Sequence, residues 1–390
     1  MYVFYTIKNV PANSVLLLNS PAEAINWPKG KITLAVSPVS GFIANIDFDP
    51  RLAEYSSRYE ATQSYSPTFN AFHKQLAETL LARFDLRQKK IIEIGCDKGD
   101  FLTMLCELGQ NEGVGFDPAY TPGRCPPPQA GRVTFIKDFY SEKYAGYEAD
   151  FICCKMTLEH IPNTAEFLSV VRRSIGQRLD TAVFFQVPNA AYILRDLAFW
   201  DIYYEHCSYF TKSSLAHLFR ATGFTVMDVW TEYDDQYLMI AARPAAAWPA
   251  APPEAVSDAA DILQAAANFA ENTPRKIVEW RNFVQNAAGR GQKIVLWGGG
   301  SKGVAFLTTL GLGVETVEYV VDVNPHKTGT YMAGTGQKIV APSFLAAYQP
   351  DVVIIMNPVY RREIGRDLAR MGLNPVVKTV DETLCEAARQ

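Results

Sequence analysis

A glutamate and two glycines in the pattern E-x-G-x-x-x-G are the residues of this sequence with the clearest chemical meaning. Glu93 lies in the apolar run 91–94, which predicts a buried strand, and Gly95 and Gly99 allow a sharp turn into a helix. Open α/β sheets bind ligands at the carboxyl ends of their strands. Asp117 ends the next strand-like run, roughly twenty residues on, which suits a carboxylate that binds both hydroxyls of a ribose. These residues predict a site for a cofactor that contains a nucleoside.

The acids in and beside this loop bear on which cofactor it takes. A dinucleotide pyrophosphate is bound by G-x-G-x-x-G, with backbone N–H groups facing the phosphates. Here the third glycine is missing, and Asp97 and Asp100 would repel a pyrophosphate. The same carboxylates suit a ligand that carries an amino group and a sulfonium charge. The loop therefore favours such a ligand over NAD.

The loop resembles the first motif of the class I S-adenosylmethionine-dependent methyltransferases. Strand-like runs at 133–136, 149–156 and 181–187 resemble the motifs that follow in that family, and the second leads into Leu-Glu-His-Ile at 158–161. The resemblance implies S-adenosylmethionine as the cofactor, with Asp117 at the ribose and an adenine contact after the third strand. It assigns these residues to the cofactor site: Glu93, Gly95, Cys96, Gly99, Asp117, Pro118, Asp138, Phe139 and Lys155, with Tyr59 and Gln63 in a segment that covers it.

Strand-like runs that alternate with helical stretches predict an α/β fold with a doubly wound, Rossmann-like parallel sheet. The 390 residues exceed what one core usually organises. We expect an amino-terminal domain at 1–85, a methyltransferase domain at 86–243 and a second Rossmann-like domain at 244–390. A linker rich in proline and alanine at 243–254 marks the last boundary.

The last domain opens with a second strand, glycine turn and helix at 293–303. This loop holds a lysine and no acid, so it suits an anion such as phosphate, although a purely structural turn is an equal alternative. The residues that we expect to bind substrate here are Gly298, Gly300, Ser301, Lys302 and Asp322.

Three stretches, at 41–49, 203–210 and 297–303, together resemble the C-methyltransferases of deoxysugar pathways. The resemblance implies C-methylation of a nucleotide-linked keto-deoxysugar. It makes His206 the base that removes the proton beside the ketone, a task that suits an imidazole, and Tyr203 and Glu205 the groups that bind the sugar oxygens. His160 is expected to be structural.

Other interpretations of these residues stay open. His206 could be a capping or core histidine, and the enzyme could methylate oxygen or nitrogen of another small metabolite. A two-domain nucleotide-sugar oxidoreductase or binding protein, with NAD in both glycine loops, is a further alternative.

The chain departs from that family near its start. Members usually begin with a small zinc-binding domain made of two C-x-x-C pairs, the second just before a Gly-Phe. Here the sequence before Gly41 is Ser37-Pro-Val-Ser, and hydroxyls do not replace thiolates as zinc ligands. We therefore expect a metal-free relic of that domain and no metal site.

The bulk composition fits a cytoplasmic enzyme of small molecules. A net charge of −4 gives no electrostatic reason to bind nucleic acid. The sequence has no run of eighteen apolar residues and no signal-peptide pattern at its start, so we expect no membrane partner. Its seven cysteines lack C-x-x-C spacing, which favours reduced thiols.

Overall fold

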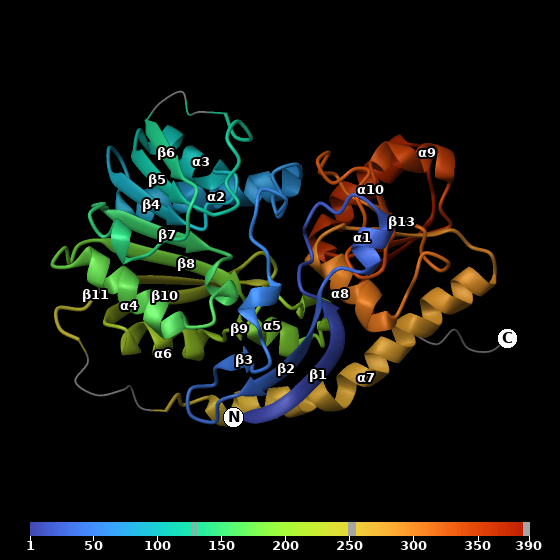
Figure 1. Cartoon of the computed structure of the whole chain (residues 1–390), viewed down its shortest axis with the longest axis horizontal. Helices are drawn as coiled ribbons and strands as arrows, with labels where there is room; N and C mark the ends of the chain where they lie inside the picture. Colours follow the sequence, from blue (N-terminus) through green and yellow to red (C-terminus); the bar gives the residue numbers. More distant parts are fainter. Residues whose placement is uncertain (127, 129–130, 249–254, 385–390) are drawn as a thin grey trace.

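The computed structural model describes residues 1–126, 128, 131–248 and 255–384, and within them the strands form three sheets (Figure 1). Residues 249–254 of the expected linker, and Cys385, lie outside the described residues. In the described part of the chain, no helix combines the length and the apolar character that crossing a membrane requires.

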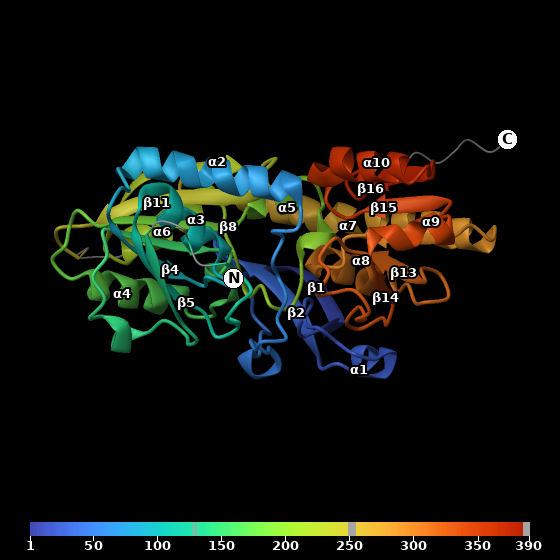
Figure 2. The same cartoon turned by 90° about the horizontal axis from the view of Figure 1, so that it is seen from above.

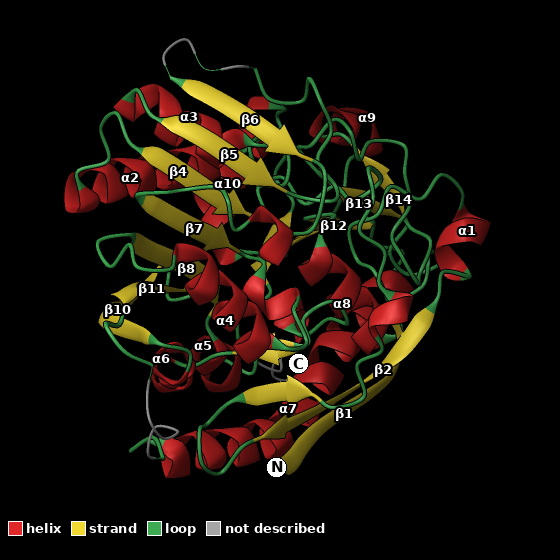
Figure 3. Ribbon diagram, turned by 60° about the vertical axis from the view of Figure 1, so that its left-hand side comes forward, coloured by secondary structure: helices red, strands yellow, loops and turns green. Residues whose placement is uncertain are grey.

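The central sheet is a doubly wound sheet, as the alternating pattern predicts. Its order is β10-β11-β8-β7-β4-β5-β6, with β11 and β10 antiparallel to five parallel strands (Figure 3). The strands are β4 (Lys90–Ile94), β5 (Glu112–Phe116), β6 (Arg132–Ile136), β7 (Phe151–Lys155), β8 (Ala182–Pro188), β10 (Phe224–Glu232) and β11 (Tyr237–Pro244).

Helices cover both faces of this sheet. One face packs on α2 (Pro67–Phe84) and α3 (Asp100–Gly109), and the other on α4 (Thr164–Ile175) and α6 (Lys212–Ala221). Figure 2 shows α2 and α4 on opposite sides of the strands. The strands are buried on both faces, which explains their nearly continuous apolar sequences.

The carboxy-terminal sheet is parallel throughout, in the order β14-β13-β12-β15-β16. Its strands are β12 (Ile294–Trp297), β13 (Tyr319–Val321), β14 (Lys338–Val340), β15 (Val352–Ile355) and β16 (Val376–Thr379). Its helices are α8 (Ser301–Leu310), α9 (Leu345–Tyr348) and α10 (Arg361–Arg370), and the long α7 (Ala259–Gly289) leads into it.

The amino-terminal sheet is antiparallel and is completed by a strand from far along the chain. Its order is β1-β2-β3-β9, with β1 (Tyr2–Pro11), β2 (Lys29–Val36), β3 (Ile43–Asn45) and β9 (Ser208–Tyr209). The short helices α1 (Pro21–Ile25) and α5 (Ala190–Arg195) lie before β2 and after β8. Its apolar residues share one core with α5, α7 and the carboxy-terminal sheet. The three-part division of the sequence stays a prediction, because this sheet has no core of its own.

The place of the missing zinc ligands is a tight turn between β2 and β3. The N–H of Gly41 donates to the carbonyl of Ser37 over 3.0 Å. Gly41 has a φ of 64°, and a Cβ on it would lie 2.4 Å from Cδ1 of Ile262 on α7. Apolar packing closes this turn, and the derivation of the sheet from a zinc-binding domain stays a prediction.

Each parallel sheet has one point where the strand order reverses. In the central sheet it lies between β4 and β7, and in the carboxy-terminal sheet between β12 and β15. Loops that leave such neighbours diverge, and the crevice between them is where open α/β sheets bind ligands. The two glycine loops follow β4 and β12, so both lie at these reversal points.

Candidate active site

A cavity of about 900 Å³ lies between the central and carboxy-terminal sheets, and both reversal points open into it. This volume is at the upper end of the roughly 300–1,000 Å³ that small-molecule sites span. The residues that line it come from the loops after β4, β5, β7, β12 and β15 and from the segment 53–66. One cavity of this size leaves room for a cofactor and a second small molecule together.

The first glycine loop requires its glycines. Gly95 and Gly99 have φ values of 73° and 94°, in the left-handed region that glycine adopts without strain. A Cβ on Gly95 would lie 1.9 Å from Oγ1 of Thr157, and one on Gly99 would lie 2.3 Å from the Phe135 ring. The turn after β4 therefore packs directly against the loop after β7. Gly95 lines the cavity, whereas Gly99 lies behind it at the start of α3.

Two carboxyl groups of this loop are buried and incompletely bonded. Oε2 of Glu93 and Oδ1 of Asp97 have no hydrogen-bond partner among the described residues. Burial raises the pKa of each to about 7, against the opposing charges of Lys155 near Glu93 and Lys98 near Asp97. Bonding to an amino group or proximity to a cation would stabilise their charged forms.

Asp117 is fixed by the backbone at the end of β5. Its Oδ2 accepts the N–H of Asp97 over 2.9 Å, and its Oδ1 accepts the N–H of Ala119 over 2.7 Å. This holds the carboxylate beside the glycine loop, where a ribose would meet it, and Pro118 and Cys96 line the cavity next to it.

The third strand ends in an aromatic side chain with a free face. Phe139 lines the cavity yet is 61% exposed, which is unusual for a large apolar residue. Its neighbour Asp138 accepts hydrogen bonds from Tyr144, over 2.7 Å, and from Lys143. An open ring beside a fixed carboxylate suits an adenine. These residues fit S-adenosylmethionine, with acids at its charged end and an aromatic face at its base.

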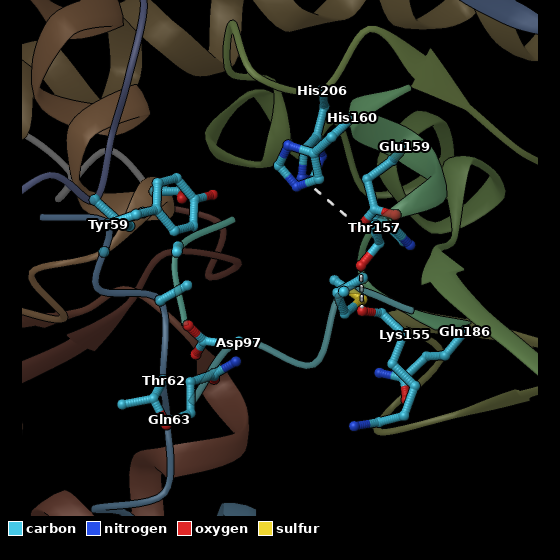
Figure 4. Close-up of a pocket in the computed structure, with 18 of the residues that line it drawn as sticks. Tyr59, Thr62, Gln63, Asp97, Lys155, Thr157, Glu159, His160, Gln186 and His206 are labelled. Carbon is cyan, nitrogen blue, oxygen red and sulfur yellow. Dashed lines mark hydrogen bonds and ion pairs between the residues drawn. The ribbon is translucent and has the colours of Figure 1, made fainter. Parts of the chain in front are cut away.

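The segment with Tyr59 and Gln63 joins both halves of the molecule across the cavity. Nζ of Lys98 donates to the carbonyl of Tyr59 over 2.8 Å, and the hydroxyl of Tyr360 donates to Oε1 of Gln63 over 2.8 Å. Both residues line the cavity (Figure 4). Their predicted position next to the cofactor loop agrees with this arrangement.

A buried imidazole pair forms another wall of the cavity. His206 is 2% exposed, and its ring centroid lies 4.0 Å from that of Tyr203 and 4.8 Å from that of His160. Nδ1 of His160 lies 2.9 Å from the hydroxyl of Tyr55. Burial lowers the pKa of His206 well below its usual value, and the charges of His160 and Lys302 add to this. His206 is therefore a neutral imidazole at pH 7, the form that can accept a proton.

The amino-terminal sheet holds the segment that carries His206. β9 directly follows it and pairs with β3, and the N–H of Asn45 donates to the carbonyl of Cys207 over 2.9 Å. On the other side, the N–H of Cys207 donates to the carbonyl of Glu159 over 2.9 Å. His206 is thus fixed between the first sheet and the loop after β7.

The comparisons with known proteins agree with this site. Residues 69–229 match the family model of a methyltransferase domain, and residues 255–374 match that of a C-methyltransferase C-terminal domain. The protein is an S-adenosylmethionine-dependent methyltransferase. The NAD-dependent alternative does not agree with these matches.

A curated relative and two solved structures show how far the similarity extends. The C-methyltransferase NovU of Streptomyces niveus is 28% identical over 289 residues, covering 70% of this methyltransferase and 67% of NovU. Magnesium protoporphyrin IX methyltransferase from Synechocystis has a TM-score of 0.35 at 13% identity, covering 46% of this chain and 84% of that one. The 1,6-didemethyltoxoflavin-N1-methyltransferase of Burkholderia thailandensis has a TM-score of 0.34 at 18% identity, covering 47% and 84%.

Glu205 of the methyltransferase lies behind the cavity wall rather than in it. Its carboxylate accepts the N–H of Ser14 over 3.0 Å, together with the Ser14 hydroxyl and the Asn13 amide. Burial raises the pKa of Glu205 to about 7, although these hydrogen bonds oppose it. The Ser14 hydroxyl also lies 2.7 Å from that of Ser301 on α8. Glu205 therefore links three parts of the molecule, and its role at the sugar oxygens stays a prediction.

The second glycine loop reaches the cavity with its lysine already paired. Gly298, Gly300, Ser301, Lys302 and Asp322 all line the cavity. Nζ of Lys302 contacts both carboxylate oxygens of Asp201, a residue that the sequence gave no reason to select. Oδ2 of Asp322 accepts the N–H of Gly299 over 3.0 Å. The loop's role as a phosphate site stays a prediction, since an anion would compete with Asp201.

Other lining residues were missed for identifiable reasons. Asn357 follows β15 at the second reversal point, so the rule that selected Asp117 would also have found it. Tyr55 lies in a family-like stretch but has no distinctive spacing, and Gln236 lies in the tight turn between β10 and β11. His160, expected to be structural, lines the cavity as well.

One cluster in the methyltransferase bears on the expectation that it has no metal site. Glu159, His160 and His206 each place one nitrogen or oxygen atom within 4.8 Å of the others. Atoms bound to one zinc ion at its usual bond lengths of ~2.1 Å lie only about 3–3.5 Å apart. The cluster is wider than that, and the expectation stays a prediction.

Proposed function

We propose that this enzyme transfers a methyl group to a carbon atom of a small ketone substrate, a nucleotide-linked keto-deoxysugar, in the cytoplasm. The observation that carries the proposal is the buried, neutral His206 on the wall of the cavity that also holds the cofactor loop. The matched C-methyltransferase C-terminal domain and the relative NovU support carbon as the acceptor.

The proposal assigns His206 the removal of a proton from the carbon beside the ketone. A carbon acid needs a base, whereas an oxygen or nitrogen acceptor already has a lone pair and needs little beyond positioning. The hydroxyl of Tyr203 would bind the ketone oxygen, where negative charge develops as the proton leaves. S-adenosylmethionine supplies the methyl group as an electrophile when it is bound.

The cofactor end of the cavity divides the remaining tasks among several residues. Glu93, Asp97 and Asp117 would hold the amino group and ribose, and Phe139 the adenine. The second glycine loop, with Lys302, would hold the nucleotide part of the acceptor. No nucleic acid or membrane partner is required for this activity.

The test uses a nucleoside diphosphate-linked 4-keto-6-deoxyhexose with methyl-labelled cofactor. Wild-type enzyme is expected to give a product one methyl heavier, with the label on carbon by NMR. His206→Ala should lower turnover on the order of 10²–10⁴-fold, the usual contribution of a general base. The affinity for S-adenosylhomocysteine, measured by calorimetry, should not change.

The matched control is His217→Ala, which removes an imidazole on α6 outside the cavity. It should retain full turnover. Methylation of oxygen or nitrogen, or turnover that survives in His206→Ala, would contradict the proposal.

A further inference from the structure

Glu159 is a buried acid in the cavity wall that the proposed chemistry has not used. Its side chain is fully buried, and both carboxylate oxygens have no hydrogen-bond partner in the part of the chain that is described. Its Oε1 lies 3.9 Å from Nε2 of His206, the contact drawn in Figure 4. Buried polar groups are nearly always hydrogen-bonded, so two unsatisfied oxygens on one carboxylate call for a functional reason.

The backbone fixes this arrangement. Glu159 lies in the 3₁₀ turn Leu158–His160 after β7, and its carbonyl accepts the N–H of Cys207, next to His206. The N–H of His160 donates to the carbonyl of Thr157 over 3.0 Å, which closes the turn. The carboxylate and the imidazole therefore face each other because two rigid segments are bonded together.

We propose that Glu159 is a positioning residue that orients the His206 imidazole and balances its charge when it takes a proton from the acceptor. This inference rests on the proposed function, in which His206 is the base. Nε2–H of His206 points toward Glu159 in this arrangement, which leaves the lone pair on Nδ1. Nδ1 has no hydrogen-bond partner among the described residues.

The proton transfer then balances as follows. The carbon–hydrogen bond beside the ketone breaks, its proton moves to Nδ1 of His206, and its electron pair becomes the enolate. The enolate carbon is the nucleophile for the methyl group that the cofactor supplies. His206 becomes an imidazolium, which is unfavourable in a buried site unless an opposite charge lies near it.

The other groups that face His206 do not provide that charge. His160 from the same turn and Lys302 from α8 both oppose a positive charge on His206. Tyr203 and Tyr209, on its own segment, are phenols whose pKa values burial raises far above neutral. Glu159 is the carboxylate in contact with the ring. Burial raises the pKa of Glu159 to about 8, so its anionic form becomes common only near that pH.

The first experiment compares wild type, Glu159→Gln and Glu159→Asp with the ketosugar probe. Glu159→Gln keeps the shape but not the charge, and should lower kcat about 10²–10³-fold, within the range of an acid–base contribution. Glu159→Asp restores the charge at a longer distance and should recover part of that loss. The affinity for S-adenosylhomocysteine should be the same in all three proteins.

The pH profile separates a charge effect from a packing effect. In wild type, kcat/KM should rise with pH up to about pH 8, where the coupled Glu159–His206 pair loses its shared proton. That limb should be missing in Glu159→Gln. A profile of unchanged shape, or a kcat that falls no more than twofold, would overturn the proposal.

A measurement without substrate keeps this inference testable if the ketosugar is not the acceptor. In ¹⁵N-histidine NMR spectra, with the His206 signals assigned from His206→Gln, the ring of wild type should carry its proton on Nε2. Glu159→Leu, which removes the acceptor, should shift this tautomer balance. Unchanged His206 signals would overturn the pairing, whether or not the ketosugar is methylated.

Thermal unfolding and metal analysis test the two remaining explanations for the cluster. Removing an unsatisfied buried carboxyl should not lower Tm at pH 8, so Glu159→Gln should be at least as stable as wild type. A lower Tm together with normal turnover would make Glu159 structural. A stoichiometric metal ion in purified enzyme, whose removal by a chelator abolishes activity, would also overturn the proposal.

Discussion

At the scale of single residues, Phe139 is the sharpest test of the cofactor site. Its ring lines the cavity and is 61% exposed, so it contributes little to the folded core. Stacking of a base on an aromatic ring is worth roughly 1–3 kcal/mol. Phe139→Ala should therefore weaken S-adenosylhomocysteine binding about tenfold or more by calorimetry, with no loss of Tm in the ligand-free enzyme.

Tyr147→Ala is the matched control for this prediction. Tyr147 is a 41% exposed aromatic residue in the same region, and it does not line the cavity. Its removal should leave cofactor affinity unchanged. Equal affinities in wild type and Phe139→Ala would mean that the adenine lies elsewhere.

The residues that the sequence identified are those at strand ends. Glu93, Asp117 and Asp138 follow buried apolar runs, and parallel topology brings the carboxyl ends of such runs to one edge of a sheet. Asp201 could not be found in this way, because its partner Lys302 is 101 residues away. A pairing of that kind depends on how the two sheets pack, which local sequence does not encode.

At the scale of elements, the amino-terminal sheet sets the position of the segment that carries His206. Gly30, at the start of β2, packs directly against Tyr204, and a Cβ there would lie 2.1 Å from the ring. Tyr204 is 1% exposed, and its hydroxyl accepts the N–H of Asp49 over 2.8 Å, so the ring has little freedom to move. Gly30→Ala should therefore displace the neighbouring Tyr203 and His206.

We expect Gly30→Ala to lower kcat with the ketosugar probe at least tenfold, since small displacements of catalytic groups are costly. Overpacking should also reduce the free energy of unfolding by about 1–3 kcal/mol. The cofactor lies on another sheet, so its affinity should stay the same. Gly365→Ala, where an added Cβ has no atom within 4 Å, should keep full activity. Normal kcat in Gly30→Ala would show that this sheet does not position the base.

The strand pairing behind this prediction could not be deduced from the sequence. β9 has two residues, too few to show the alternation by which strands are recognised. Its partner β3 has three and lies more than 160 residues earlier by the printed bounds. By contrast, the expected helices at 67–84 and 256–288 appear as α2 and α7, because long periodic stretches carry a strong local signal.

At the scale of the whole molecule, the site is a product of two sheets that face each other. The sequence indicated two Rossmann-like units, each with a glycine loop, but not that their reversal points open into one cavity. Short polar contacts join the two halves next to that cavity, including the amide of Gln236 to Asn357 over 3.0 Å and the hydroxyl of Tyr233 to Tyr360 over 2.7 Å.

Glu363 makes a further contact of this kind, and its removal tests how tightly the halves are coupled. Its Oε2 on α10 accepts the Ser66 hydroxyl over 2.8 Å and the N–H of Thr68 over 2.9 Å, at the start of α2. A carboxylate there satisfies free N–H groups and the positive end of the helix. Ser66 also caps α2 itself, by accepting the N–H of Phe69, so the helix should survive without Glu363.

Glu363→Ala should therefore loosen the contact between the two sheets without unfolding either. We expect the free energy of unfolding in urea to fall by about 1–2 kcal/mol, the range for hydrogen bonds to a charged group. The transition should also broaden, because weaker coupling lets the halves unfold separately. Arg362→Ala, which removes the exposed neighbour of Glu363, should change neither quantity. A single sharp transition at the wild-type midpoint would show that the apolar core shared by α7 and both sheets holds the cavity together without this contact.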